Sequence, residues 1–126
     1  MSFASDIYTL LTANTAVNNS VSGIYYQIIP DNESITANNI VYDFYLSESI
    51  DILAQNNLID IYNVDIIILS DDTLEVNTIA GLLRNYLDNY KDSKFGDVKA
   101  ENFDVKWEGE RGQYIGTLKY KITYLK

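Results

Sequence analysis

The sequence has 126 residues, 47% hydrophobic and 21% charged, which predicts one folded domain spanning residues 1–126. It contains no cysteine and no histidine, which excludes disulfides, thiolate or imidazole metal sites and the common catalytic triads. The net charge of −9 argues against a protein that grips nucleic acid, because such binding depends on Lys and Arg neutralising phosphates.

The charge is unevenly distributed along the chain. All nine basic residues lie within residues 84–126, whereas residues 1–83 carry eleven carboxylates and no Lys or Arg. A monomer could tolerate this asymmetry, since net charge speaks mainly to solubility. The alternative is a polar subunit whose acidic and basic surfaces pair head to tail between copies.

Neither a membrane span nor a secretory signal is expected. The most apolar stretch, residues 59–69, is interrupted by Asp60, Asn63 and Asp65. The first six residues lack the basic start and small-residue cleavage site of a signal peptide. We therefore expect the protein to function in the compartment where it is made.

The first elements follow from spacing and turn residues. Apolar residues at helical spacing predict a helix over residues 3–13, with Ser2 as its N-cap. Residues 14–23 are polar and predict a loop. Residues 24–29 are β-branched and aromatic and predict a strand that Pro30 ends.

The middle of the chain predicts two further strands. Apolar and polar residues alternate over residues 40–46, as in a strand with one buried face. Residues 47–57 are predicted to form a connection whose apolar side chains make it a candidate interface. Residues 58–69 are almost continuously apolar at their end, so this strand should be central in the sheet.

The last third predicts a helix and a hairpin. Asp72 is a candidate N-cap for a helix whose apolar stripe runs to about Tyr90. A charged connection over residues 91–99, a strand over residues 103–108 and a turn over residues 109–112 follow. The closing strand has two different faces. One face carries Tyr114, Leu118, Tyr120, Ile122 and Tyr124, and the other carries Thr117, Lys119, Lys121 and Thr123. The order predicts an α+β fold: a single mostly antiparallel sheet of four to five strands packed by two helices on one face.

The sequence offers little for catalysis. Three pairs of carboxylates could be proposed for acid–base work or for a hard cation: Asp71 with Asp72, Asp60 with Asp65, and Glu108 with Glu110. Helix capping, solvated strand alternation and a charged hairpin tip explain them more simply. We expect no enzyme, no cofactor and no metal site.

Tyrosine is unusually frequent, with eleven residues. Packing on core faces is the default interpretation for Tyr42, Tyr86, Tyr120 and Tyr124. Tyr25, Tyr26, Tyr45 and Tyr62 are harder to bury together, and tyrosine is enriched at protein–protein contacts. Tyr45 and Tyr62, with Lys119 and Lys121 on the closing strand, are therefore candidate interface residues.

Taken together, the segments resemble the small tail-terminator or tail-completion (head–tail joining) proteins of long-tailed bacteriophages, over almost the whole chain. The resemblance rests on residues 3–11 (FASDIYTLL), 23–25 (GIY) leading to Pro30, 39–42 (NIVY), 79–83 (IAGLL) with 87–88 (LD), and 120–124 (YKITY). These are patterns of order and spacing and carry no catalytic signature.

The resemblance implies a virion subunit that forms a homo-oligomeric, hexameric ring at the head-proximal end of the tail. Such a ring would end polymerisation of the tail tube protein and dock onto the head–tail connector protein, with DNA only as passing cargo. It would be made in the host cytoplasm. The family has no catalytic residues to carry over.

Four carboxylates in predicted loops, Asp31, Glu33, Glu48 and Asp51, are candidates for the channel or for contacts within the ring. Two other functions stay open. One is another connector or head-completion subunit, since the same small domain can serve either joint. The other is a monomeric small-molecule-binding or carboxylate-dependent enzyme domain, which predicts a deep pocket with a carboxylate of raised pKa.

Overall fold

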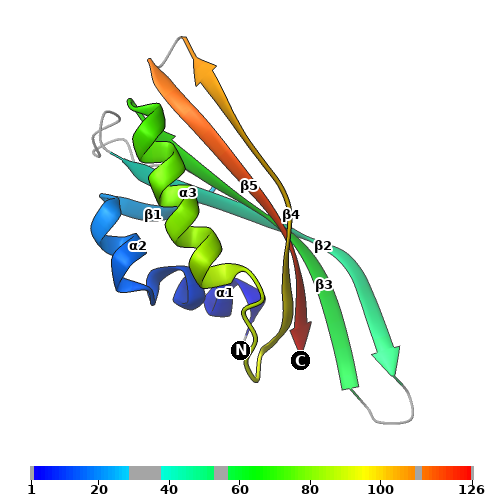
Figure 1. The fold of residues 1–126 in the computed structure, drawn as a ribbon. Coiled ribbons are helices and arrows are strands. Elements are labelled where there is room, and N and C mark those ends of the chain that lie inside the picture. The colour runs from blue at the N-terminus through cyan, green and yellow to red at the C-terminus, as the bar shows by residue number, and fades with distance from the viewer. Residues whose placement is uncertain (1, 29–37, 53–56, 110–111, 126) are drawn as a thin grey trace.

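The computed structural model describes residues 2–28, 38–52, 57–109 and 112–125, with side chains for all of these except 51, 52, 57 and 58. Its elements in chain order are α1 (Phe3–Thr12), α2 (Thr15–Ser20), β1 (Gly23–Tyr26), β2 (Asn39–Ile52), β3 (Asn57–Ser70), α3 (Thr73–Leu87), β4 (Phe95–Glu108) and β5 (Gln113–Leu125). Figure 1 shows them in one twisted layer of strands beside one layer of helices.

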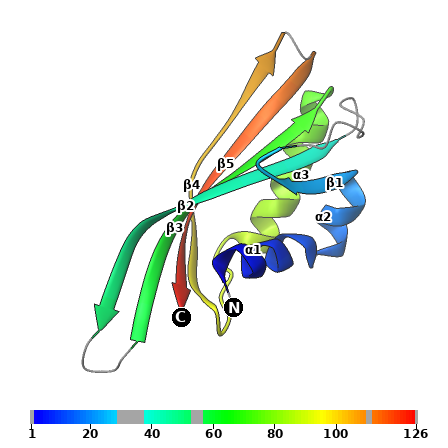
Figure 2. The same cartoon turned by 180° about the vertical axis from the view of Figure 1, so that it is seen from behind.

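The strands form one sheet in the order β1-β2-β3-β5-β4. β1 runs parallel to β2, and the other neighbours are antiparallel. This confirms the predicted single, mostly antiparallel sheet and the central place of β3. All three helices lie on the same side of the sheet (Figures 1 and 2).

The sheet therefore has two different faces. We call the one under the helices the helix-covered face, and it carries the alternate apolar residues of the strands, such as Ile66 of β3 and Tyr120 of β5. The other we call the open face, and it carries Lys119 and Lys121 of β5. The predicted division of β5 into a buried and a wet face is confirmed.

The helices begin where capping side chains are available. The Ser2 hydroxyl accepts a hydrogen bond from the Ser5 amide (3.2 Å), and the Asp72 carboxylate accepts one from the Leu74 amide (2.9 Å). Both N-caps were predicted. α3 ends at Leu87 rather than near Tyr90, because Asp88 has an extended backbone.

Two strands are longer than the sequence predicts. β2 continues through residues 47–52, which we predicted to be a connection, and β4 begins at Phe95 within the predicted charged connection. The pairing register shifts between Leu46 and Glu48 in β2, and twice in β4. A β-bulge changes which residues face the core, so it breaks the two-residue alternation on which the prediction relied.

The predicted loop over residues 14–23 also contains a helix, α2. It is six residues long and buries only Val17, so the sequence has no apolar stripe that would predict it. The Asn14 side chain accepts a hydrogen bond from the Val17 amide at 3.0 Å and starts the helix.

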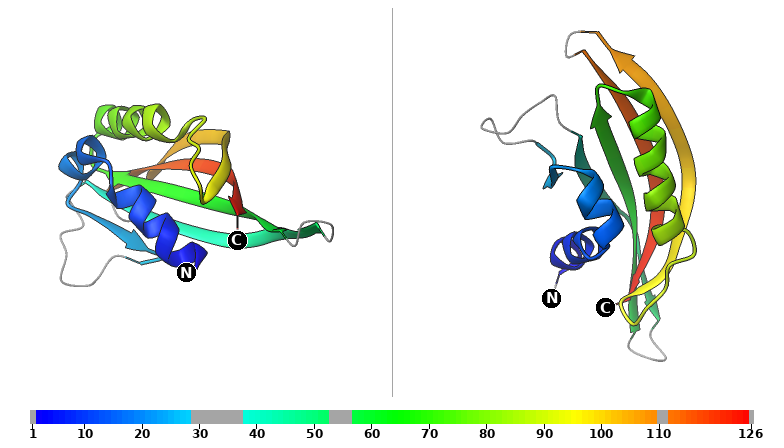
Figure 3. Two further views of the ribbon diagram at one scale, coloured as in Figure 1. Left: turned by 90° about the horizontal axis from the view of Figure 1, so that it is seen from below. Right: turned by 60° about the vertical axis from the view of Figure 1, so that its left-hand side comes forward.

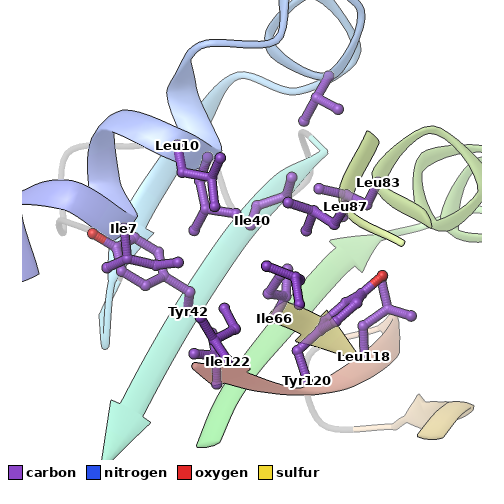
Figure 4. Close-up of a cluster of buried hydrophobic side chains, with 14 of the residues drawn as sticks. Ile7, Leu10, Ile40, Tyr42, Ile66, Leu83, Leu87, Leu118, Tyr120 and Ile122 are labelled. Atoms are coloured by element: carbon purple, nitrogen blue, oxygen red, sulfur yellow. The ribbon is translucent and has the colours of Figure 1, made fainter. Parts of the chain in front are cut away.

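One continuous core fills the space between the helices and the sheet. Figure 4 shows side chains of α1 and α3 meeting those of β2, β3 and β5. Ile7 and Leu83 are each 1% exposed, and Ile40 is fully buried. Gly116 of β5 lets α3 approach closely, because a Cβ there would lie 2.5 Å from a methyl carbon of Val76.

The sheet extends beyond the helices at both ends. The paired ends of β2 and β3 pass α1 at one end, and those of β4 and β5 pass the start of α3 at the other (Figures 1 and 3). The molecule is therefore elongated, with a different pair of strands exposed at each end.

Candidate assembly interface

In the carboxylate pairs named as possible chemical sites, the side chains either lie apart or stabilise the fold. Asp72 caps α3, and Asp60 and Asp65 lie on opposite faces of β3. Asp60 is only 2% exposed and accepts a hydrogen bond from Ser49, so the predicted solvated position for it is wrong. The partner proposed for Glu108, Glu110, lies outside the described residues. Over the described ranges, no three His, Cys, Asp or Glu side chains gather closely enough to hold a metal ion.

A hollow of about 300 Å³ opens on the open face near the ends of β4 and β5. It is lined by Asp65, Asp104, Lys106, Trp107, Glu108, Ile115, Thr117 and Lys119, a mixture of both charges.

Within the described residues, no helix is long and apolar enough to cross a membrane.

Asp6 is a buried carboxylate that joins three elements. It lies on α1 with 5% exposure, accepts a hydrogen bond from the Tyr124 hydroxyl of β5, and pairs with Lys94 Nζ at 3.0 Å. The Tyr124 hydrogen bond, followed by Lys94, lowers the pKa of Asp6 against the opposing effect of burial. Burial and the bond to Asp6 raise the pKa of Tyr124 to about 12.

A second carboxylate, Asp88, ties the end of α3 to the sheet. Its side chain accepts a hydrogen bond from the Tyr120 hydroxyl at 2.9 Å and pairs with Arg84 at 3.2 Å. Burial, and then the bond to Asp88, raise the pKa of Tyr120. The Tyr86 hydroxyl similarly donates to the Leu10 carbonyl oxygen (2.9 Å) and joins α3 to α1.

The turn before β4 uses a further tyrosine. Tyr90 donates its hydroxyl to Asp92 at 2.9 Å, and burial followed by this bond raises the pKa of Tyr90 to about 12. Burial opposes ionisation of Asp92, but hydrogen bonds from the Phe95 and Lys94 amides lower its pKa. Four of the eleven tyrosines thus use their hydroxyls to join helices, a turn and strand β5.

The candidate channel or ring-contact residues are only partly described. Asp31 and Glu33 lie outside the described residues. Glu48 is exposed on β2, and the backbone of Asp51 lies in β2 opposite Leu58. Glu48 and Asp51 therefore belong to the strand pair that extends past the helices.

The candidate interface residues fall into two groups. Tyr45 is 63% exposed on the open face of β2, and Lys119 and Lys121 are exposed on β5. Tyr62 is partly buried in an aromatic cluster, where its ring stacks on Phe3 with centroids 3.8 Å apart. The structure thus brings none of these tyrosines beside the lysines within one copy of the chain.

β2 has a free edge because β1 is short. The last register pair is Tyr26 with Tyr42, and the next residue, Gln27, has a φ of 67° that turns the chain away. Over residues 43–50, β3 lies beside β2 on one side, and among the described residues no strand lies on its other side. We call this segment the β2 free edge. Leu46, 50% exposed, and Ile50, 38% exposed, lie on it.

The opposite half of the open face carries lysines. Lys99 of β4 is directly opposite Lys121 of β5, and Lys119 lies two residues before Lys121 on the same face of β5. We call Lys99, Lys119 and Lys121 the lysine triplet. The described residues form two ion pairs, Arg84 with Asp88 and Lys94 with Asp6, and neither includes the lysine triplet.

The sequence predicted Lys119, Lys121 and Tyr45 as interface residues and Glu48 as a channel or ring-contact residue. It did not predict Lys99, nor that residues 43–50 form one strand edge. Lys99 stood in a predicted connection, and Leu46 stood at the end of a predicted strand. The signal that could have found them is the polar–apolar alternation on both sides of each bulge, read with a one-residue shift.

Comparison with known proteins gives a fold and no sequence family. No protein-family model matches the sequence, and no curated protein matches it. Among solved structures, the fold is similar to a chain of the virion of a native gene transfer agent (GTA) particle, with a TM-score of 0.68 and 11% sequence identity. The match covers 99% of this chain and 100% of that chain. At this identity the similarity establishes a shared fold over the full length.

Proposed function

We propose that this chain is a virion structural subunit of a phage-like particle, and that it forms a ring at the head-proximal end of the tail. The observation that carries the proposal is the full-length fold similarity to a virion chain, which covers 99% and 100% of the two chains. The sequence resemblance to tail-terminator proteins supports the finer assignment to the tail end.

The charge distribution supports a polar subunit. The acidic β2 free edge and the lysine triplet lie on opposite sides of the central strand β3. A contact between two unlike surfaces repeats from copy to copy and closes into a ring when the rotation allows it. In such a ring the partners are the tail tube protein and the head–tail connector protein, and DNA passes through without being specifically bound.

A channel for DNA would be lined by carboxylates under this proposal. Asp31, Glu33, Glu48 and Asp51 are the candidates, either for the channel or for contacts between neighbouring subunits. Acidic side chains repel the phosphate backbone, so a channel lined by them lets DNA slide without being held.

The proposal is tested by the mass of the purified protein and its effect on tail tubes. Sedimentation should give about six times the chain mass of 14.3 kDa. Added to growing tail-tube subunits, the protein should cap the tubes and shorten their length distribution. A particle reconstruction should then place it between the tube and the connector.

Three outcomes would contradict parts of the proposal. A protein that stays monomeric and leaves tube length unchanged rules out the terminator ring. Binding to the connector alone would assign it to the other head–tail joint. A reconstruction with all four candidate carboxylates on the outer rim would remove the channel assignment.

A further inference from the structure

We infer that two copies of this chain meet head to tail, with the β2 free edge of one copy against the lysine triplet of the next. This inference rests on the proposed function and names the two surfaces that would build the ring. It follows from the free edge itself, from the two charge patterns and from their separation in the sheet.

The two edges of the sheet are not equally protected. The outer strand β4 has two register shifts, at Gly96 and Glu101, and alternating charges, features that discourage a partner from pairing along it. The β2 free edge instead presents Leu46 and Ile50 to solvent, next to the exposed Tyr45. Exposed apolar side chains along a free edge are typical of a contact site.

Recognition at the β2 free edge would use side chains as well as backbone groups. The Phe44 amide donates to the side chain of Asp43 at 2.9 Å, and Gln27 Nε2 donates to the same carboxylate at 3.1 Å. That amide is therefore already satisfied. The exposed side chains available to a partner include the Glu48 carboxylate, Leu46 and Ile50.

The charges on the β2 free edge favour the lysine triplet of a second copy as its partner. A symmetric contact between two β2 free edges would bring Asp43 and Glu48 against the same acids of the second copy, which is unfavourable. The complementary charge lies in the same chain, on the lysine triplet. Lys99 of β4 and Lys121 of β5 are direct cross-strand neighbours, and like charges directly opposite each other destabilise a sheet. Lys119 has Asp65 of β3 opposite it, so carboxylates from a second copy would act mainly on Lys99 and Lys121.

The position of the two surfaces makes the contact directional. β2 and β4 lie on opposite sides of the central strand, and the far ends of β2 and β3 extend past the helices (Figures 1 and 3). A copy that uses its β2 free edge therefore keeps its lysine triplet available for the next copy. This is the heterologous contact that a ring requires.

Disulfide trapping tests the contact, because the natural chain has no cysteine. Glu48→Cys and Lys121→Cys variants are purified separately, mixed and oxidised, and linked dimers are counted on a non-reducing gel. We expect linked dimers in the mixture but not in Glu48→Cys alone. Asn85→Cys, on the exposed side of α3, replaces Lys121→Cys in the control mixture and should not link.

Charge exchange provides the second measurement. Glu48→Lys and Lys121→Glu should each weaken self-association at least about tenfold, and the double variant should return to within about threefold of the natural chain. Lys91→Glu carries the same charge change on an exposed loop and should have no effect. Sedimentation gives the association, and circular dichroism checks that each variant is folded.

The outcomes separate the two proposals. Rings that form normally in both single variants, or Glu48→Cys that links to itself as readily as to Lys121→Cys, would overturn this interface while leaving the ring. A natural chain that never self-associates, alone or with tail-tube subunits, would overturn both.

Discussion

Single tyrosine hydroxyls in this chain act as links between elements that are distant in sequence. Tyr124 joins β5 to Asp6 of α1, and Tyr120 joins β5 to Asp88 at the end of α3. Each hydroxyl donates to an ionised carboxylate, and such charge-assisted bonds are stronger than those between neutral groups. The Asp6 site is the most consequential, since its carboxylate is nearly inaccessible to water.

Replacement of Asp6 by Asn should destabilise the fold at neutral pH. We expect the free energy of unfolding to fall by about 1.5–3 kcal/mol, the range for hydrogen bonds to charged groups. The folded pKa of Asp6 is lowered, so its contribution is present above the unfolded pKa and is lost as pH falls through the folded value. Urea unfolding at about pH 7 and again in acid, below the folded pKa of Asp6, measures the difference, which should shrink there.

The control for this prediction is Asp97→Asn, on the exposed part of β4. It removes one carboxylate without touching the buried cluster and should change stability by less than about 0.5 kcal/mol. An Asp6→Asn variant whose deficit were equal at both pH values would show that the charge of Asp6 does not stabilise the fold.

At the level of elements, α3 is held close to the sheet by the absence of a side chain. Gly116 of β5 faces α3, where Val76 is fully buried. Gly81 is the opposite case, because it lies on the exposed side of α3 and a Cβ there would meet nothing within 4 Å. The two glycines therefore contrast a close helix–sheet contact with a solvent-exposed helix position.

Substitution of the two glycines by alanine should have effects of opposite sign. Gly116→Ala should lower the free energy of unfolding by about 1–3 kcal/mol, because Val76 and α3 must move away from the new methyl group. Gly81→Ala should raise it by about 0.8–1 kcal/mol, the difference in helix propensity. Chemical denaturation of both variants measures this. Equal stability of Gly116→Ala and the natural chain would mean that α3 is packed less closely than described.

The elements that could be predicted are those whose periodicity is unbroken. α3 and β5 have regular apolar stripes and were predicted with their faces, and the Asp72 cap was predicted with them. The extension of β2 and the start of β4 were missed, because register shifts at Ser47 and Gly96 displace the alternation by one residue. The candidate site shares part of this limit, since Lys99 and residues 47–50 of the β2 free edge lie in those extensions.

For the whole molecule, the separation of acidic and basic residues can be tested directly by measuring self-association in solution. The β2 free edge belongs to the part of the chain without a basic residue, and the lysine triplet belongs to the part that holds all nine. If copies associate through these surfaces, attraction between them should weaken as salt screens it.

Self-association should therefore decrease as ionic strength rises. The screening length falls from about 10 Å at 0.1 M to about 3 Å at 1 M, so exposed charge pairs lose most of their attraction. Sedimentation across this range should show a shift toward smaller species, with a weaker salt dependence in the Lys119→Glu and Lys121→Glu double variant. An assembly state independent of salt in both proteins would argue for a mainly apolar contact.

The strand order has a consequence for synthesis of the chain. β3 is finished at Ser70, but its partner β5 begins only at Gln113, more than forty residues later. Until β5 has left the ribosome, the apolar run at residues 66–69 keeps one unpaired edge, the kind of segment through which nascent chains aggregate. The eleven carboxylates of residues 1–83 meet no basic residue before position 84, so neighbouring nascent chains repel one another during that interval.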